Sequence, residues 1–95
     1  MTAYVVMIRD EMTDADAFGQ YAKSAPGASA GHAVTPRAFY GRQEIKEGPE
    51  CEGVAILECP AFEQAKAWYE SPEYQEVMQH RLRGARYRVV IVEGM

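Results

Sequence analysis

The sequence has little positive charge, few cysteines and no long hydrophobic run, and each shortage excludes a class of protein. Among its 95 residues, 10 are Lys or Arg and 14 are Asp or Glu, which gives a formal net charge of −4. Because acids and bases are interspersed, the chain lacks the basic patch that binds nucleic acid or an anionic membrane. No stretch approaches the roughly 20 apolar residues that span a bilayer, and the N-terminus lacks the features of a signal peptide. We therefore expect a cytoplasmic protein with no nucleic-acid or membrane partner.

Residues that bind metals or nucleotides are also scarce. Cys51 and Cys59 have no CxxC partner and no neighbouring histidine that would suggest zinc, so we expect two unlinked thiols. His32 and His80 are the only histidines, and no cluster with carboxylates supports a transition metal. A Gly-rich nucleotide loop is missing as well. The sequence predicts neither a metal nor a cofactor.

The apolar residues that are present predict four extended segments and two helical regions. Three strands are expected at residues 4–8, 54–59 and 87–92. An extended arm is expected over residues 37–45, with Pro36 at its beginning or at a sheet edge. Helical spacing predicts one helix opened by a capping box of Thr13 and Asp16, and another from Phe62 onward. The order β-α-β-β-α-β predicts a single domain over residues 1–95, an α+β ferredoxin-like fold with a four-stranded antiparallel sheet.

Two proline-containing segments mark helix boundaries. Pro26 followed by glycine predicts the end of the first helix. Ser71 and Pro72 break the second helical region, because serine is a good N-cap and proline suits the first helical position. Trp68, just before this break, is expected in the core.

The first and last strands are apolar on both faces, which predicts an interface. Strands of this kind are buried on both faces, yet the chain has helices enough to cover only one. We therefore expect a homodimer in which two four-stranded sheets pack face to face.

Several motifs together resemble the uncharacterised family DUF1330. They are Ala3-Tyr4-Val5-Val6, Glu47-Gly48, Glu58-Cys59-Pro60, the block Ala67-Trp68-Tyr69-Glu70-Ser71-Pro72-Glu73-Tyr74-Gln75, Arg81, and Val90-Ile91-Val92-Glu93-Gly94. The resemblance implies the dimeric α+β barrel superfamily, whose members include small monooxygenases and muconolactone isomerases. It implies no mechanism, since the family has no established activity.

Two charged residues are candidates for a site. Glu58 ends an apolar strand, where partial desolvation would raise the pKa of its carboxyl group and suit it to proton transfer. Arg81 shares an otherwise apolar helix face with Tyr74 and must pair with something, either Glu58, a backbone carbonyl or an anionic ligand. The alternative for both residues is a structural ion pair.

His32 and four tyrosines complete the candidate set. His32 lies in a Gly-flanked segment before the second strand, where a residue at a pocket rim could move a proton. Tyr4, Tyr21, Tyr69 and Tyr74 are either core and interface aromatics or the lining of a small apolar cleft between helices and sheet. His80 is expected to point toward solvent.

Three functions are compatible with these residues. The first is binding of a small organic molecule in the cleft. The second is a cofactor-free isomerase or monooxygenase that uses Glu58 or His32 for proton transfer. The third is a structural or interaction module without a ligand.

Overall fold

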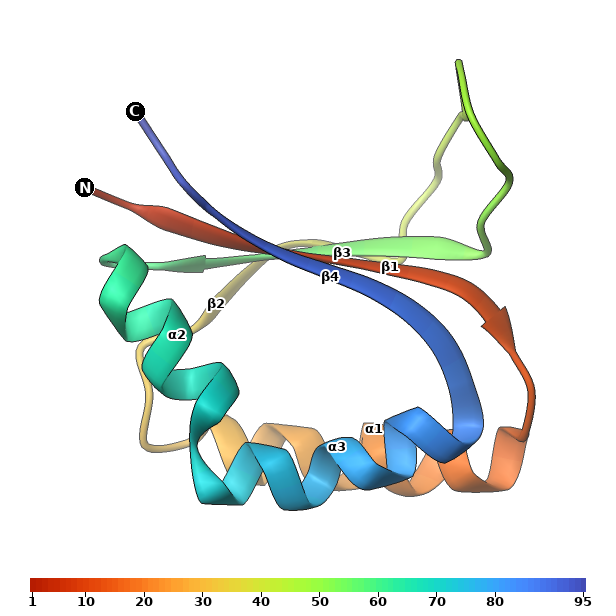
Figure 1. Ribbon diagram of the computed structural model, residues 1–95, viewed down its shortest axis with the longest axis horizontal. Coiled ribbons are helices and arrows are strands. Elements are labelled where there is room, and N and C mark those ends of the chain that lie inside the picture. Colours follow the sequence, from red (N-terminus) through yellow and green to blue (C-terminus); the bar gives the residue numbers. More distant parts are fainter.

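The computed structural model describes all of residues 1–95 and has the predicted ferredoxin-like order of elements. The elements are β1 (Ala3–Met12), α1 (Ala15–Ser29), β2 (Thr35–Phe39), β3 (Gly53–Cys59), α2 (Phe62–Glu70), α3 (Pro72–Gly84) and β4 (Ala85–Glu93). The strands form one antiparallel sheet in the order β2-β3-β1-β4. Figure 1 shows all three helices on one side of this sheet. None of them combines the length and hydrophobicity that crossing a membrane requires.

The core lies between the sheet and the helices and follows the two-residue alternation of the strands. Val5 and Met7 of β1 are buried beneath the helices, and the neighbouring Leu57 and Cys59 of β3 are buried beside them. Trp68, only 2% exposed, joins the same core as predicted. Cys51 and Cys59 are both unlinked.

The other face of the sheet carries no helix (Figure 1). The side chains that alternate onto this face are largely apolar. Their exposed members include Val90 and Val92, which pair across β4 and β1 with Val6 and Tyr4. The larger apolar side chains on this open face are those of Tyr4, Val6, Ile8, Val54, Ile56, Val90 and Val92. This arrangement agrees with the sequence pattern, in which the strands are apolar on both faces.

The boundary between α2 and α3 confirms the prediction for Ser71 and Pro72. The Ser71 hydroxyl accepts from the backbone N–H of Tyr74 at 3.3 Å and donates to the carbonyl of Trp68 at 2.8 Å. Pro72 occupies the first turn of α3, where its missing N–H costs nothing. One serine thus satisfies backbone groups on both sides of the break.

The start of α1 differs from the prediction. Asp14, not Thr13, is the N-cap, and its carboxylate accepts from the backbone N–H groups of Asp16 and Ala17. The backbone N–H of Thr13 instead donates to the carbonyl of Gly84 at 2.8 Å. The backbone of Thr13 therefore ties the start of α1 to the end of α3.

The predicted end of α1 at Pro26 is also wrong, since the helix continues to Ser29. Hydrogen bonds that involve a residue of α2 stabilise the last turn of α1. The indole N–H of Trp68 donates to the Ser29 hydroxyl at 2.9 Å, which in turn donates to the carbonyl of Ala25 at 3.1 Å. Burial of Ala28 in the same turn adds to this anchoring and outweighs the helix-breaking tendency of Pro26.

Two strand boundaries were misplaced as well. β1 runs on to Met12 because ion pairs across to β4, such as Arg88 to Asp10 at 2.8 Å, carry it past a bulge. β2 ends at Phe39 rather than continuing to residue 45, because Tyr40 takes a left-handed backbone conformation with φ of 55°. Pro36 lies on an edge strand, as expected. The loop after Tyr40 rises from the open face of the sheet (Figure 1).

Gly84 provides the first test of this architecture. A Cβ atom there would lie 2.5 Å from the backbone nitrogen of Phe18, so Gly84→Ala should lower the free energy of unfolding by about 1–3 kcal/mol. Gly19→Ala is the matched control, because Gly19 is exposed on α1 and nothing lies within 4 Å of the added Cβ. This substitution should raise the free energy of unfolding by about 0.5–1 kcal/mol. Urea unfolding measures both, and equal effects would contradict the close approach of α1 and α3.

Candidate functional site

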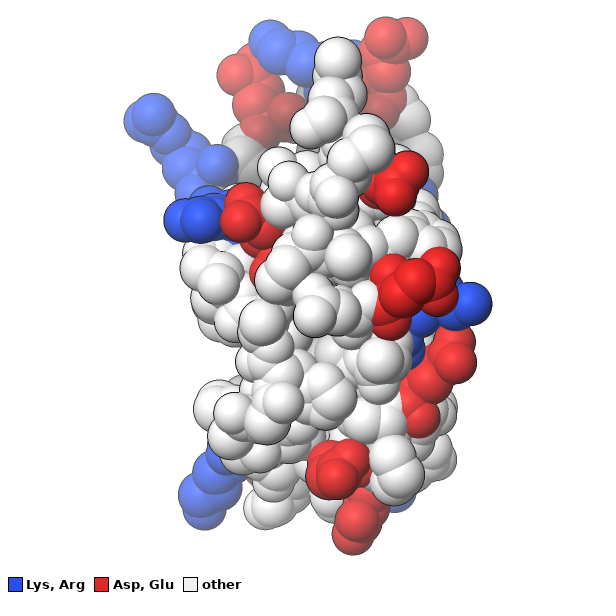
Figure 2. All heavy atoms as spheres, turned by 90° about the vertical axis from the view of Figure 1, so that its left-hand side faces the viewer, with Lys and Arg blue, Asp and Glu red and all other residues white.

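A cavity of about 620 Å³ lies between α1 and the β2–β3 half of the sheet. It forms because α1 packs mainly on α3 rather than on the strands, so α1 leaves space above this half. The volume is within the range of roughly 300–1,000 Å³ that is typical of small-molecule sites. On the side of the molecule with the chain termini, Figure 2 shows a mostly uncharged central band, with acidic residues mainly on its right and basic residues mainly on its left.

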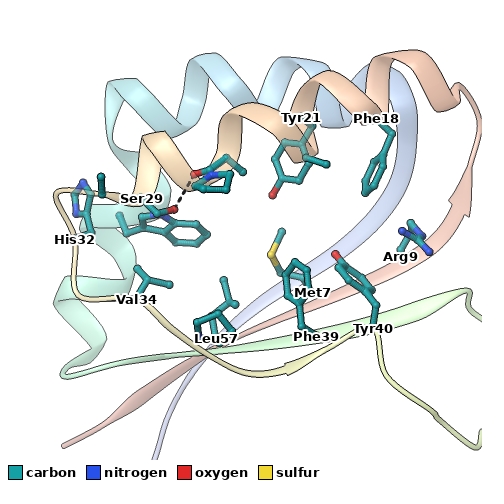
Figure 3. Close-up of a pocket in the computed structure, with 16 residues that line it drawn as sticks. Met7, Arg9, Phe18, Tyr21, Ser29, His32, Val34, Phe39, Tyr40 and Leu57 are labelled. Carbon is teal, nitrogen blue, oxygen red and sulfur yellow. Dashed lines mark hydrogen bonds between the residues drawn. The ribbon is translucent and has the colours of Figure 1, made fainter.

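The wall of the cavity is predominantly apolar. Eleven of its 16 residues are hydrophobic when its two tyrosines are counted among them, and they include the aromatic side chains of Phe18, Phe39 and Trp68. Met7 and Leu57 form the floor on the sheet side (Figure 3). Such a surface suits the apolar or aromatic body of an organic molecule.

Five polar or charged side chains interrupt this wall. They are Arg9, Tyr21, Ser29, His32 and Tyr40. His32 and Arg9 lie at opposite ends, and the Tyr21 and Tyr40 hydroxyls face the middle (Figure 3). No Asp or Glu lines the cavity, although acidic residues outnumber basic ones in the chain as a whole.

Arg9 closes the end of the cavity opposite His32. Its guanidinium lies 5.2 Å from the ring centre of Phe18 and 4.9 Å from that of Tyr40. Its Nε lies 3.2 Å from Oε1 of Glu52 but has no aligned hydrogen-bond partner. The charge of Arg9 is therefore largely balanced by Glu52 at the edge of the site.

Each of the two tyrosines in the wall is hydrogen-bonded to a second tyrosine behind it. The hydroxyls of Tyr21 and Tyr74 are 2.7 Å apart, and those of Tyr40 and Tyr87 are also 2.7 Å apart. The ring of Tyr40 can lie against β3 only because Gly53 has no side chain, since a Cβ there would be 2.8 Å from Cδ1 of Tyr40.

Burial raises the pKa of three of these phenols. For Tyr21 the pKa rises chiefly through burial, with the neighbouring Tyr74 adding to it. Burial raises the pKa of Tyr74 as well, although its hydrogen bond with Tyr21 and the charge of Arg81 oppose the rise. The pKa of Tyr87 is raised by burial and by its hydrogen bond with Tyr40. All three hydroxyls are therefore neutral groups near neutral pH.

Arg81 lies within this cluster and has no acidic partner. It is only 2% exposed, and none of the five ion pairs of the chain includes it. One of its terminal nitrogens donates to the Tyr69 hydroxyl at 3.4 Å, and its Nε has no partner. Its guanidinium lies over the rings of Tyr87 and Tyr21, at 4.9 and 5.9 Å from their centres.

The structure brings together only part of the predicted site. Tyr21 and His32 line the cavity, and Tyr69, Tyr74 and Arg81 lie behind its wall in the same cluster.

Tyr4 and Glu58 lie on the open face of the sheet, so the expected convergence of Glu58 and Arg81 in one cleft is wrong. The alternation of β3 turns Glu58 away from the buried Leu57 and Cys59. Glu58 instead accepts hydrogen bonds from Arg37 at 3.2 and 3.3 Å in a surface ion pair.

Arg9, Phe18 and Tyr40 are functional candidates that sequence reasoning missed. The predicted first strand stops at residue 8, before Arg9, and Tyr40 falls in an arm without a defined face. The left-handed conformation of Tyr40 turns its ring under α1, and no pattern in the sequence indicates this. Nor does the structure contain any group of His, Cys, Asp and Glu side chains that could hold a metal ion.

Comparisons with known proteins agree with this fold. The model of DUF1330, a domain of unknown function, matches residues 2–95. None of the curated proteins matches the sequence.

Three solved structures show the same fold at low sequence identity. A protein of unknown function from Rhodopseudomonas palustris has a TM-score of 0.77 at 16% identity, over 99% of this chain and 82% of its own. A Dabb family protein from Mesorhizobium loti has a TM-score of 0.70 at 10% identity, over 99% and 97%. A protein from Thermobifida fusca described as dimeric and ferredoxin-like has a TM-score of 0.69 at 8% identity, over 99% and 92%. These similarities show the ferredoxin-like fold, in agreement with the element order of the structure.

The buried phenols predict the response of the protein to alkaline pH. Because folding raises the pKa of Tyr21, Tyr74 and Tyr87 above the ordinary value of 10.0, their stabilising effect is complete below pH 10 and is lost at higher pH. We expect their tyrosinate absorbance to appear only as the protein unfolds. Absorbance at about 295 nm and circular dichroism, followed together, measure this. In urea the same phenols should titrate near pH 10. Ionisation of all the tyrosines before any loss of structure would contradict their burial.

Proposed function

Because the chain belongs to the DUF1330 family, for which no activity is established, we propose a function from its own geometry: the protein binds a small organic molecule in the cavity between α1 and the sheet. The observation that carries this proposal is the combination of a preformed volume, an apolar wall and a few polar groups in the middle of that wall. A protein that served only as a structural module would gain stability by filling such a space, since each unfilled void forfeits packing.

A second candidate is a cofactor-free enzyme, an isomerase or a monooxygenase, and the position of His32 favours it. This imidazole is at the rim of the cavity, and imidazole is the side chain best suited to proton transfer near neutral pH. Glu58, the other proton-transfer candidate, faces away from the cavity and has no part in this scheme.

NMR spectroscopy of a bound compound distinguishes the two candidates. A spectrum that is unchanged over hours favours binding alone. A product that forms with the native protein, and does not form with His32→Gln, favours the enzyme.

Ligand binding is tested with a thermal-shift screen of aromatic acids, lactones, quinols and thioesters. A ligand at about 100 times its Kd adds roughly 2.7 kcal/mol to the stability of the native state, which is easily visible for a small domain. Ala25→Phe places a bulky ring inside the cavity and should abolish the shift given by any hit. Ala67→Phe is the matched control, because Ala67 is exposed on α2 and does not line the cavity. A shift that survives Ala25→Phe would place the ligand elsewhere.

We also propose that two copies of the chain associate through the open face of the sheet. The apolar side chains on this face would be covered by the same face of a second copy, in agreement with the description of the Thermobifida fusca protein as dimeric. Burial of apolar surface is worth about 25 cal/mol per Å², which makes the face a strong source of association energy. The Arg37–Glu58 and Arg88–Asp10 ion pairs lie at the borders of this patch, where polar residues are typical of an interface rim.

Two charge-introducing variants test the assembly. Val90 is 54% exposed on the open face, and Leu82 is 56% exposed on α3, so both tolerate a longer polar side chain in the single copy. Light scattering after size exclusion should give about twice the chain mass of 10.6 kDa for the native protein and for Leu82→Arg. Val90→Arg should give the single-chain mass, because it buries an unpaired charge in the interface. A native protein that is monomeric at micromolar concentration would refute the proposal.

A further inference from the structure

We propose that the cavity selects organic anions, carboxylates above all, through the hydroxyls of Tyr21 and Tyr40 with the buried charge of Arg81 behind them. This inference rests on the proposed binding function and specifies the chemical class of the ligand.

The first argument is the balance of charge around the cavity. No carboxylate lines it, and the one arginine in its wall, Arg9, is already paired with Glu52. Behind the wall lies a second arginine, Arg81, which is 2% exposed and has no acidic partner. Burying a charge without a partner is unfavourable, and buried charges are normally paired. The structure therefore carries one uncompensated positive charge close to a cavity without negative charge.

The second argument is where this charge lies. The guanidinium of Arg81 contacts one ring from each hydrogen-bonded tyrosine pair: Tyr21 from the pair with Tyr74, and Tyr87 from the pair with Tyr40. Both pairs therefore experience the same cation, and each pair places one hydroxyl in the wall of the cavity. Figure 3 shows the two wall hydroxyls, of Tyr21 from α1 and of Tyr40 from the sheet side, on opposite sides of the same space.

The direction of the hydroxyl hydrogens is the third argument. Within each pair one hydroxyl donates to the other, since the oxygens are 2.7 Å apart and each carries a single hydrogen. A nearby cation orients these dipoles with oxygen toward the charge and hydrogen away from it. The hydroxyls behind the wall then donate to Tyr21 and Tyr40, whose own hydrogens point into the cavity. Two donors with a positive charge behind them match an oxyanion, because hydrogen bonds to charged acceptors are the strong ones.

The shape of the wall indicates the rest of the ligand. Phe18, Phe39 and Trp68 present aromatic surface on several sides of the space. A planar ring bearing one carboxylate would contact these aromatics while its charged end met the two hydroxyls. We therefore take aromatic monocarboxylates, which are ionised at pH 7, as the probes.

The experiment compares carboxylates with neutral analogues of the same shape by isothermal titration calorimetry. The probes are benzoate, phenylacetate and β-naphthoate, each paired with its primary amide. At least one carboxylate should bind about tenfold or more tightly than its amide, the difference expected for a hydrogen bond to a charged acceptor. In Tyr21→Phe and in Tyr40→Phe that ratio should fall below about threefold, with the Kd of the amide nearly unchanged.

Tyr69→Phe is the control for a merely structural effect. Tyr69 accepts from Arg81 but does not line the cavity, so this variant should keep the carboxylate preference. Circular dichroism confirms that each variant is folded before its ratio is interpreted.

The outcomes separate the inference from the proposed function. An amide that binds as well as its carboxylate overturns the anion preference and leaves the binding function in place. A preference that survives both cavity substitutions also overturns it, because the hydroxyls would then not be its source. Absence of binding by every probe, in a protein that the thermal-shift screen also finds without ligand, overturns both.

Discussion

The close contact between the ends of α1 and α3 determines where the cavity lies. Gly84 brings the end of α3 against the backbone of Phe18, and its carbonyl accepts the N–H groups of Thr13 and Asp14. Because this contact fixes α1 on α3, the helix is not free to settle onto β2 and β3. The unfilled space above those strands is the cavity. Phe18, next to the contact, lines that space and stacks on Tyr87 at 6.2 Å with an interplanar angle of 11°.

Arg81, buried behind the wall without an acidic partner, is not a residue that stability alone would select. Arg81 could be replaced in principle by an apolar side chain of similar volume, and such replacements of buried charges are often neutral or stabilising. Four tyrosines, Tyr21, Tyr69, Tyr74 and Tyr87, instead surround its guanidinium. The hydroxyls of Tyr21 and of Tyr40, the partner of Tyr87, lie in the wall of the cavity. Buried, unpaired polar groups of this kind are more typical of sites than of cores optimised for stability.

The fold could be predicted from the sequence because its signals are local. Short apolar runs rich in β-branched residues identified the strands, and the Ser71–Pro72 pair located the break between α2 and α3. The errors arose where a distant contact overrode a local signal. Trp68 holds the last turn of α1 beyond Pro26, and the carbonyl of Gly84 takes the N–H of Thr13, so that Asp14 becomes the cap.

The site could be predicted only in part, for a reason specific to this sheet. Both sides of the central strands are apolar. The alternation along β3 therefore shows that Glu58 and Leu57 point in opposite directions, but not which of these residues points toward the helices. The helical spacing of Tyr74 and Arg81 correctly placed them on one face. The position of Tyr40 could not be predicted from the sequence, because it depends on the left-handed backbone conformation of Tyr40 itself and on the missing side chain of Gly53.

The same alternation separates the two proposed binding surfaces by one layer of backbone. Met7 and Leu57 face the cavity, whereas their neighbours Val6 and Ile56 pair with each other on the open face. A ligand and a second copy of the chain would therefore contact opposite sides of the same strands without sharing a side chain. Coupling between them would have to pass through the sheet itself, whose β1–β3 register is unbroken over this region. A regular, well-paired strand pair is a poor element for switching, because it lacks the two alternative arrangements that allostery needs. The geometry thus favours an assembly that holds the sheet rigid beneath the cavity, with ligand binding independent of the association of the two copies.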